Sequence, residues 1–75
     1  MKNNNNPNQP TTLSQTRAIL SYLKNGHRLT QLQAIDMFGC MRLPSRIHDI
    51  EKLGITVNRQ FIKLLSGKRV KEYWI

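Results

Sequence analysis

The side chains of this chain that are best suited to chemistry lie in two stretches, residues 42–52 and 59–75. The first stretch carries hydroxyl, imidazole and cationic groups, which can hydrogen-bond to base edges or to phosphate oxygens: Arg42, Ser45, Arg46, His48 and Lys52. The second carries five basic residues against the single acid Glu72, and four of the five surround a Ser66-Gly67 turn: Lys63, Lys68, Arg69 and Lys71. Both sets favour binding to a polyanion.

Other kinds of chemistry find little support in the residue types. Cys40 is the only cysteine, so a metal site of several thiolates is excluded. His27 and His48 are far apart in the sequence and do not show the close spacing that is typical of zinc ligands. The four acids, the two histidines and the cysteine form no nucleophile or acid–base set of the kind that catalysis requires. We therefore expect no metal, no cofactor and no enzymatic activity.

Length and charge narrow the class of protein further. The chain has 75 residues, with 12 Lys and Arg against 4 Asp and Glu, and its formal net charge is +8. A chain of this size supports one small core, and its charge indicates nucleic acid or an acidic membrane surface as partner, with nucleic acid favoured. No apolar run approaches the roughly 18 residues of a spanning helix, and the Asn-rich start differs from a signal peptide. A cytoplasmic location without membrane contact is expected.

An amphipathic helix over residues 43–53 is predicted to position the first set. Leu43, Ile47, Ile50 and Leu53 recur at helical spacing, Pro44 suits the first turn, and residue 54 is a glycine that can end the helix. Helical geometry then places Ser45, His48 and Lys52 on the outer face, where an ordinary solvated surface is the alternative to DNA contact. Arg46 is equally suited to holding phosphate or to pairing with Asp49, three residues later.

Two further helices are expected before this one. Capping boxes at Thr12-Leu13-Ser14-Gln15 and at Thr30-Gln31-Leu32-Gln33 indicate helices of about 13–25 and 31–38. The second helix should bury Ala34, Ile35 and Phe38, and Gly39 allows the sharp turn after it. Two short helices joined by a tight turn containing glycine are typical of a helix-turn-helix.

A β-hairpin is predicted after the helices. Residues 55–58 and 61–64 are rich in β-branched and aromatic side chains, Ser66-Gly67 supplies a turn, and residues 70–75 read as the returning strand. The two alternating phases in the first strand predict a bulge or bend near residues 58–60. Tyr73 and Ile75 should point inward, which leaves Trp74 to cover the apolar side of the hairpin or to contact a partner.

The domain organisation follows from these elements. Residues 1–12 contain four consecutive asparagines and two prolines with almost no apolar side chain, so a disordered tail is expected there. Residues 13–75 should form one α+β domain with a three-helix core and a hairpin.

Residues 13–75 also resemble a family of short winged helix-turn-helix domains found in bacterial and phage proteins. Phe38-Gly39 followed by Arg42-Leu43, Arg46-Ile47 and Asp49-Ile50 is the most specific part of the resemblance, and Pro44 departs from the family pattern of small helix-forming residues. The other matching positions are Thr16-Arg17, Ile19-Leu20, Leu29-Thr30, Ala34, Ser45, Gly54-Ile55, Gly67, Tyr73 and Ile75. The resemblance implies DNA binding, in regulation or in the functions of a mobile element.

The expected function is therefore that of a duplex DNA-binding protein, a small transcriptional regulator or a phage-type factor. The helix near 43–53 would enter the major groove, and the basic hairpin would follow the phosphate backbone or the minor groove. Solvated charge on a small sheet is the alternative for the hairpin, and a module for protein or RNA contacts is the alternative for the whole domain. A monomer or weak dimer, able to bind cooperatively at adjacent DNA sites, is expected.

Overall fold

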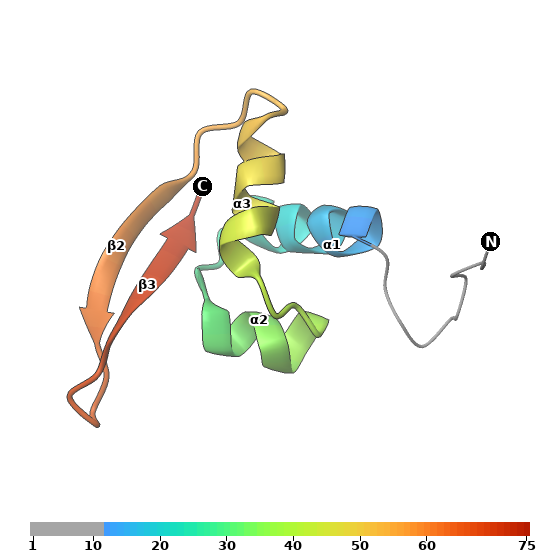
Figure 1. Ribbon diagram of the computed structural model, residues 1–75. Helices are drawn as coiled ribbons and strands as arrows, with labels where there is room; N and C mark the ends of the chain where they lie inside the picture. The colour runs from blue at the N-terminus through green and yellow to red at the C-terminus, as the bar shows by residue number, and fades with distance from the viewer. Residues whose placement is uncertain (1–11) are drawn as a thin grey trace.

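The computed structural model describes residues 12–75 and has an α+β architecture, with three helices beside a small antiparallel sheet (Figure 1). This confirms the predicted fold class. In chain order the elements are α1 (Thr12–Lys24), β1 (Leu29–Thr30), α2 (Gln31–Phe38), α3 (Leu43–Glu51), β2 (Asn58–Lys63) and β3 (Arg69–Trp74). The predicted tail lies outside the described residues, except that Thr12 already belongs to α1.

The start of α1 differs from the predicted capping box. Thr12 is part of the helix, and its carbonyl accepts a hydrogen bond of 2.9 Å from the Thr16 hydroxyl. The Gln15 amide nitrogen donates to the carbonyls of Phe38 and Gly39, at 3.3 and 3.1 Å. These bonds satisfy carbonyls at the end of α2, where the helix itself supplies no partner. Gln15 therefore ties α1 to α2.

The second capping box is confirmed at α2. The Thr30 hydroxyl accepts from the backbone N–H of Gln33, and the Gln33 side chain accepts from the backbone N–H of Thr30. At the other end Gly39 adopts the left-handed conformation, with φ of 63°, so the chain turns sharply as predicted. Ala34 is completely buried, whereas Ile35 is 40% exposed because only a narrow side of this short helix faces the core. The prediction that Ile35 is buried was wrong.

One side chain holds the turn between α2 and α3 in place. Gln31 donates from its amide nitrogen to the carbonyl of Cys40 at 2.7 Å and accepts from the backbone N–H of Leu43 at 2.8 Å. Because one partner lies in the turn and the other is the first residue of α3, these bonds fix the orientation of α3 relative to α2. The geometry of the helix-turn-helix thus rests on a half-buried hydrogen-bonded bridge.

Helix α3 forms with the predicted inner face, except at its end. Leu43, Ile47 and Ile50 are fully buried. Leu53 is 65% exposed, which corrects the prediction that it continues the apolar stripe. The reason is that the helix ends at Glu51 and the chain then turns, reaching a φ of 89° at residue 54, so Leu53 no longer follows the helical period.

A single apolar cluster joins the helices to the sheet. Its buried members come from all three helices, from β1 and β3, and from the connecting segments: Ile19, Leu23, Leu29, Ala34, Cys40, Leu43, Ile47, Ile50, Val57 and Tyr73. The side of α3 that lies away from this cluster is left for other contacts.

The sheet has the strand order β1-β3-β2, with all neighbours antiparallel. Every residue of β2 has one partner in β3, from Asn58 opposite Trp74 to Lys63 opposite Arg69. The predicted bulge is therefore absent from this strand pair. The two apolar phases are reconciled differently: Ile55 and Val57 pack before the strand begins, and β2 starts only at residue 58. The pairing of β1 with β3 was not predicted.

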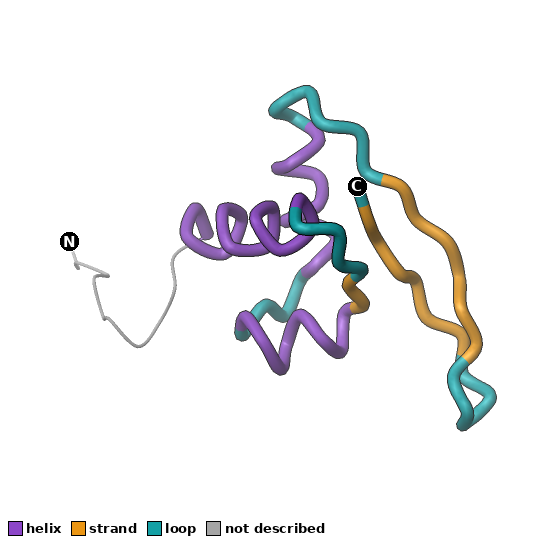
Figure 2. The backbone as a smooth tube through the Cα atoms, turned by 180° about the vertical axis from the view of Figure 1, so that it is seen from behind, coloured by secondary structure: helices purple, strands orange, loops and turns teal. Residues whose placement is uncertain are grey.

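The β2–β3 hairpin, residues 58–74, extends away from the helices in both views (Figures 1 and 2), and we call it the wing. At its base Trp74 is half-buried, and the Arg28 guanidinium lies 4.1 Å from the centre of its ring. Arg28 also pairs with Glu72 at 3.5 Å. The Trp74 ring is thus in cation–π contact with Arg28. Ile75 is 41% exposed rather than turned fully inward.

Tyr73 at the base of the wing makes the folded domain sensitive to alkaline pH. Burial raises the pKa of the Tyr73 phenol above its ordinary value of 10.0; the Arg59 guanidinium lowers this pKa and the Glu51 carboxylate raises it. The folded state therefore holds the phenol proton more tightly than the unfolded chain, whose tyrosines ionise near pH 10. Stability linked to Tyr73 is fully present below about pH 10 and is lost as the pH rises through the folded-state pKa.

Urea unfolding at a series of pH values between about 9 and 11 tests this linkage. The wild type should lose more free energy of unfolding over that interval than Tyr73→Phe, which has no phenol to ionise. Equal losses in the two proteins would show that the buried phenol does not govern the alkaline limit.

Candidate nucleic-acid interface

Ion pairing divides the basic residues into two groups. Three of the chain's four acids pair with arginines: Asp49 with Arg46, Glu51 with Arg59, and Glu72 with Arg28. Within residues 12–75, the cations that belong to no ion pair are Arg17, Lys24, Arg42, Lys52, Lys63, Lys68, Arg69 and Lys71. Two of these flank α3 and four lie on the wing, so most of the uncompensated charge is on these two elements.

The predicted α3 residues differ in how accessible they are. Arg42, His48 and Lys52 are exposed, whereas Ser45 and Arg46 are half-buried. Helical geometry places His48, Lys52 and Ser45 within one arc of the helix, opposite the buried stripe. This arc carries an imidazole, an ammonium and a hydroxyl group.

Arg46 is held by a contact inside the protein. Its Nε donates to the Asp49 carboxylate at 3.0 Å, and only 17% of its side chain is exposed. Of the two alternatives left open for Arg46, the structure shows the pairing with Asp49. The remaining guanidinium nitrogens are oriented by this bond, so a phosphate contact by Arg46 stays a prediction.

Strand register brings three of the four wing residues onto one side of the hairpin. Lys63 lies opposite Arg69, and Lys71 lies opposite Phe61, and partners in an antiparallel pair point to the same side. Tyr73, which is buried against the helices, shares this side two residues further along β3. The three cations therefore lie on the side of the wing that turns toward the helical core.

Phe61 supports two of these cations from the same side. It is 59% exposed, and its ring centre lies 5.2 Å from the Arg69 guanidinium carbon and 5.4 Å from the Lys71 ammonium nitrogen. Cation–π attraction reduces the freedom of both long side chains. This contact could not be predicted from the sequence, because it depends on strand register.

Arg59 connects α3 to the wing. It is the fifth basic residue of the stretch 59–75, and the sequence alone indicated no individual role for it. Its guanidinium donates to the Glu51 carboxylate at the end of α3, and it lies 5.5 Å from the centre of the Tyr73 ring. The helix and the hairpin are thus joined by a charge-assisted hydrogen bond next to the core. The two cation-bearing elements have a defined relative position.

The comparison with protein families agrees with this geometry. A family profile described as a winged helix-turn-helix domain matches residues 14–75, which is most of the chain. The chain belongs to this winged helix-turn-helix family. No curated protein and no solved structure matched it. Winged helix-turn-helix domains are in general DNA-binding rather than catalytic, and the family assignment confirms the resemblance found in the sequence.

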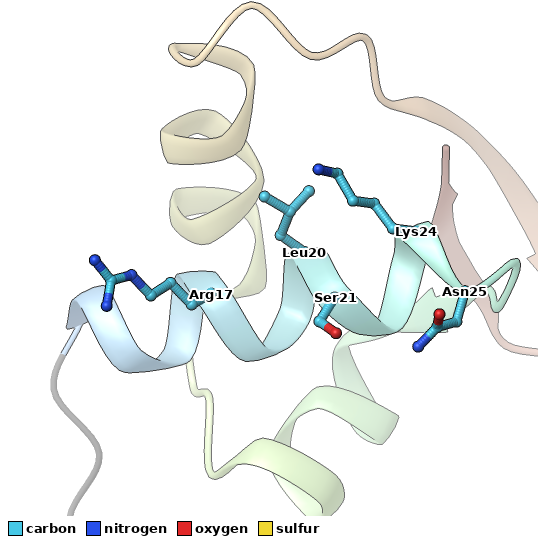
Figure 3. A pocket seen from close by; sticks show the side chains of 5 residues that line it. All are labelled: Arg17, Leu20, Ser21, Lys24 and Asn25. Atoms are coloured by element: carbon cyan, nitrogen blue, oxygen red, sulfur yellow. The ribbon is translucent and has the colours of Figure 1, made fainter.

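Other surface features of the winged helix-turn-helix domain offer little for catalysis. A shallow pocket on α1 is lined by Arg17, Leu20, Ser21, Lys24 and Asn25, with both cations at its rim (Figure 3). Its lining includes no carboxylate, thiol or imidazole. Among the described residues, no group of three or more His, Cys, Asp or Glu side chains is arranged to hold a metal ion, and no helix is long and apolar enough to cross a membrane.

Proposed function

We propose that this winged helix-turn-helix domain binds duplex DNA, with α3 in the major groove and the wing along the phosphate backbone. The observation that carries the proposal is the position of the unpaired cations. Most of them lie on α3 and the wing, two elements that the Arg59–Glu51 bond joins. A helix fits the major groove of B-DNA, and lysine and arginine side chains neutralise phosphates.

The assignments of single residues follow from exposure. Arg42 and Lys52 are proposed to contact phosphate at the two ends of α3, and His48 and Ser45 to contact base edges between them. Lys63, Lys68, Arg69 and Lys71 are proposed to contact the backbone beside the minor groove. Arg46, oriented by its bond to Asp49, is proposed to contact phosphate beside the other residues of α3.

The biological role proposed is that of a small transcriptional regulator or a factor of a mobile element such as a phage, acting in the bacterial cytoplasm. One domain with a single recognition helix reads few base pairs, so cooperative binding of monomers or weak dimers at adjacent sites would raise specificity. The proposed boundaries of the DNA-binding domain are residues 13–75.

Selection of bound sequences from a random duplex pool, followed by gel shift on the selected site, tests the proposal. Wild type should recover a defined sequence. His48→Ala and Ser45→Ala should each weaken binding to that sequence by about 1–3 kcal/mol, while binding to a scrambled duplex changes little, because base edges differ and phosphates do not. Binding that is equally strong on selected and scrambled DNA in all three proteins would contradict a base-reading role for α3.

A module for protein contacts is the second candidate, and one observation favours it. Large apolar side chains are exposed on α2 and in the turn after it: Leu32, Ile35, Met37 and Met41. Exposed apolar surface of this kind is typical of binding sites for other proteins. A wild type that shifts neither duplex DNA nor single-stranded RNA would favour this candidate, and a shift of RNA alone would favour an RNA-binding module.

A further inference from the structure

The tip of the wing carries a large apolar side chain that does not pack against the rest of the domain. Leu65 lies in the loop between β2 and β3 and is fully exposed; its exposed fraction of 109% exceeds that of every other exposed large apolar residue among those described. Tight turns favour Gly, Pro, Asn, Asp and Ser, so turn chemistry does not account for a leucine here. Its side chain makes no contribution to the core.

Hydrogen bonds hold this loop in a defined shape. The Leu64 N–H donates to the Lys68 carbonyl at 2.7 Å, and the Gly67 N–H donates to the Leu64 carbonyl at 2.8 Å. The Lys68 N–H donates to the Ser66 hydroxyl at 3.4 Å, and Gly67 has a positive φ of 90° that other residues rarely adopt. Leu65 is therefore presented by an ordered turn, which lowers the entropy lost on binding.

The surroundings of Leu65 specify an anionic partner. Residues 63–71 contain four basic side chains and no acid. An apolar partner surface on another protein would leave these cations uncompensated, whereas phosphates along a DNA groove would neutralise them on both sides of the leucine. Apolar side chains beside such cations are known to enter the minor groove and to part adjacent base pairs.

We propose that Leu65 is an apolar wedge, a side chain that the wing inserts between base pairs in the minor groove and that bends the duplex. This inference rests on the proposed function and adds a residue and a DNA distortion to it. Lys68 and Arg69 anchor the wing on the flanking phosphates. The wedge enters most readily at flexible pyrimidine–purine steps, which gives the wing a sequence preference without base hydrogen bonds.

Fluorescence energy transfer between the ends of a duplex of about 30 base pairs, with a central TA step, measures the bend. Wild type should shorten the end-to-end distance and should raise the fluorescence of 2-aminopurine placed at the TA step. Leu65→Ala should abolish both signals while still binding the duplex within roughly tenfold of wild type and with the same salt dependence, because no charge is removed. Leu65→Met, which keeps an apolar side chain, should retain the bend.

Leu13→Ala is the matched control, because Leu13 is also an exposed leucine and belongs to α1, the helix whose start lies on the side away from the wing (Figure 1). It should behave as wild type in every assay. A Leu65→Ala protein that bends and unstacks the duplex as wild type does would overturn the wedge alone, as would a wild type that binds without bending. Binding of each protein to vesicles of anionic lipid is measured in parallel. Failure of the wild type to bind any duplex would overturn the wedge and count against DNA as its partner. The same conclusion would follow if Leu65→Ala weakened binding to the vesicles and left duplex binding and bending unchanged.

Discussion

Ile47→Ala is expected to leave most of the protein unfolded at 25 °C. Ile47 is 1% exposed and lies in the middle of α3, within the one apolar cluster that joins the helices to the sheet. Removing a large aliphatic side chain from such a position costs about 2–5 kcal/mol, and the total stability of a small domain is only about 5 kcal/mol. Circular dichroism during thermal and urea unfolding measures the loss.

Leu53→Ala is the matched control for this prediction, because sequence periodicity placed Leu53 in the same stripe and the structure exposes it. It should change the free energy of unfolding by no more than about 0.5 kcal/mol, as should Ser45→Ala on the outer face of α3. Equal destabilisation by Ile47→Ala and Leu53→Ala would mean that α3 extends beyond Glu51 and that its buried face is assigned incorrectly.

Replacing Lys68 and Arg69 together with alanine is expected to weaken binding to every duplex alike. Both residues are exposed and belong to no ion pair among residues 12–75, so each is free to neutralise a phosphate. Loss of two phosphate contacts should lower the slope of log K against log salt concentration by about 2, because each contact releases counterions. The measurement is a salt titration on the selected site and on a scrambled duplex.

The matched control replaces Arg17 and Lys24 together with alanine. Both are unpaired cations on α1 that line the pocket of Figure 3. This double variant removes the same charge from a surface outside the proposed interface, so its salt slope should stay close to that of wild type. Equal slopes in the two double variants would show that net charge, rather than the wing, governs binding. A change of preferred sequence in the Lys68 and Arg69 variant would show that the wing reads bases.

Most of the helical architecture was predictable because its signals are local. The Thr30–Gln33 capping box begins α2 and Gly39 ends it, and both depend on residues a few positions apart. The spacing of Leu43, Ile47 and Ile50 likewise indicated the buried side of α3. The same local geometry indicated the pairing of Arg46 with Asp49, three residues later, as one of two alternatives, and the structure shows that pairing.

The features that could not be predicted depend on contacts between distant parts of the chain. The alternation of apolar residues at 55–64 was interpreted as one irregular strand. In the structure Val57 is buried in the core, and β2 begins only at the next residue. The partner of β1 lies more than 40 residues away, as the bond between Arg28 and Glu72 also shows. The support that Phe61 gives to Arg69 likewise follows only from strand register.

Backbone amide chemical shifts of isotope-labelled protein, mapped during titration with the selected duplex, test whether α3 and the wing form the DNA-binding surface. The expectation is that the largest changes occur at residues 42–52 and 63–71, where the unpaired cations of α3 and the wing lie, and that the outer side of α1 around Arg17 and Lys24 changes little. Largest changes at Leu32, Ile35 and Met37 on α2, with little effect on the wing, would contradict it.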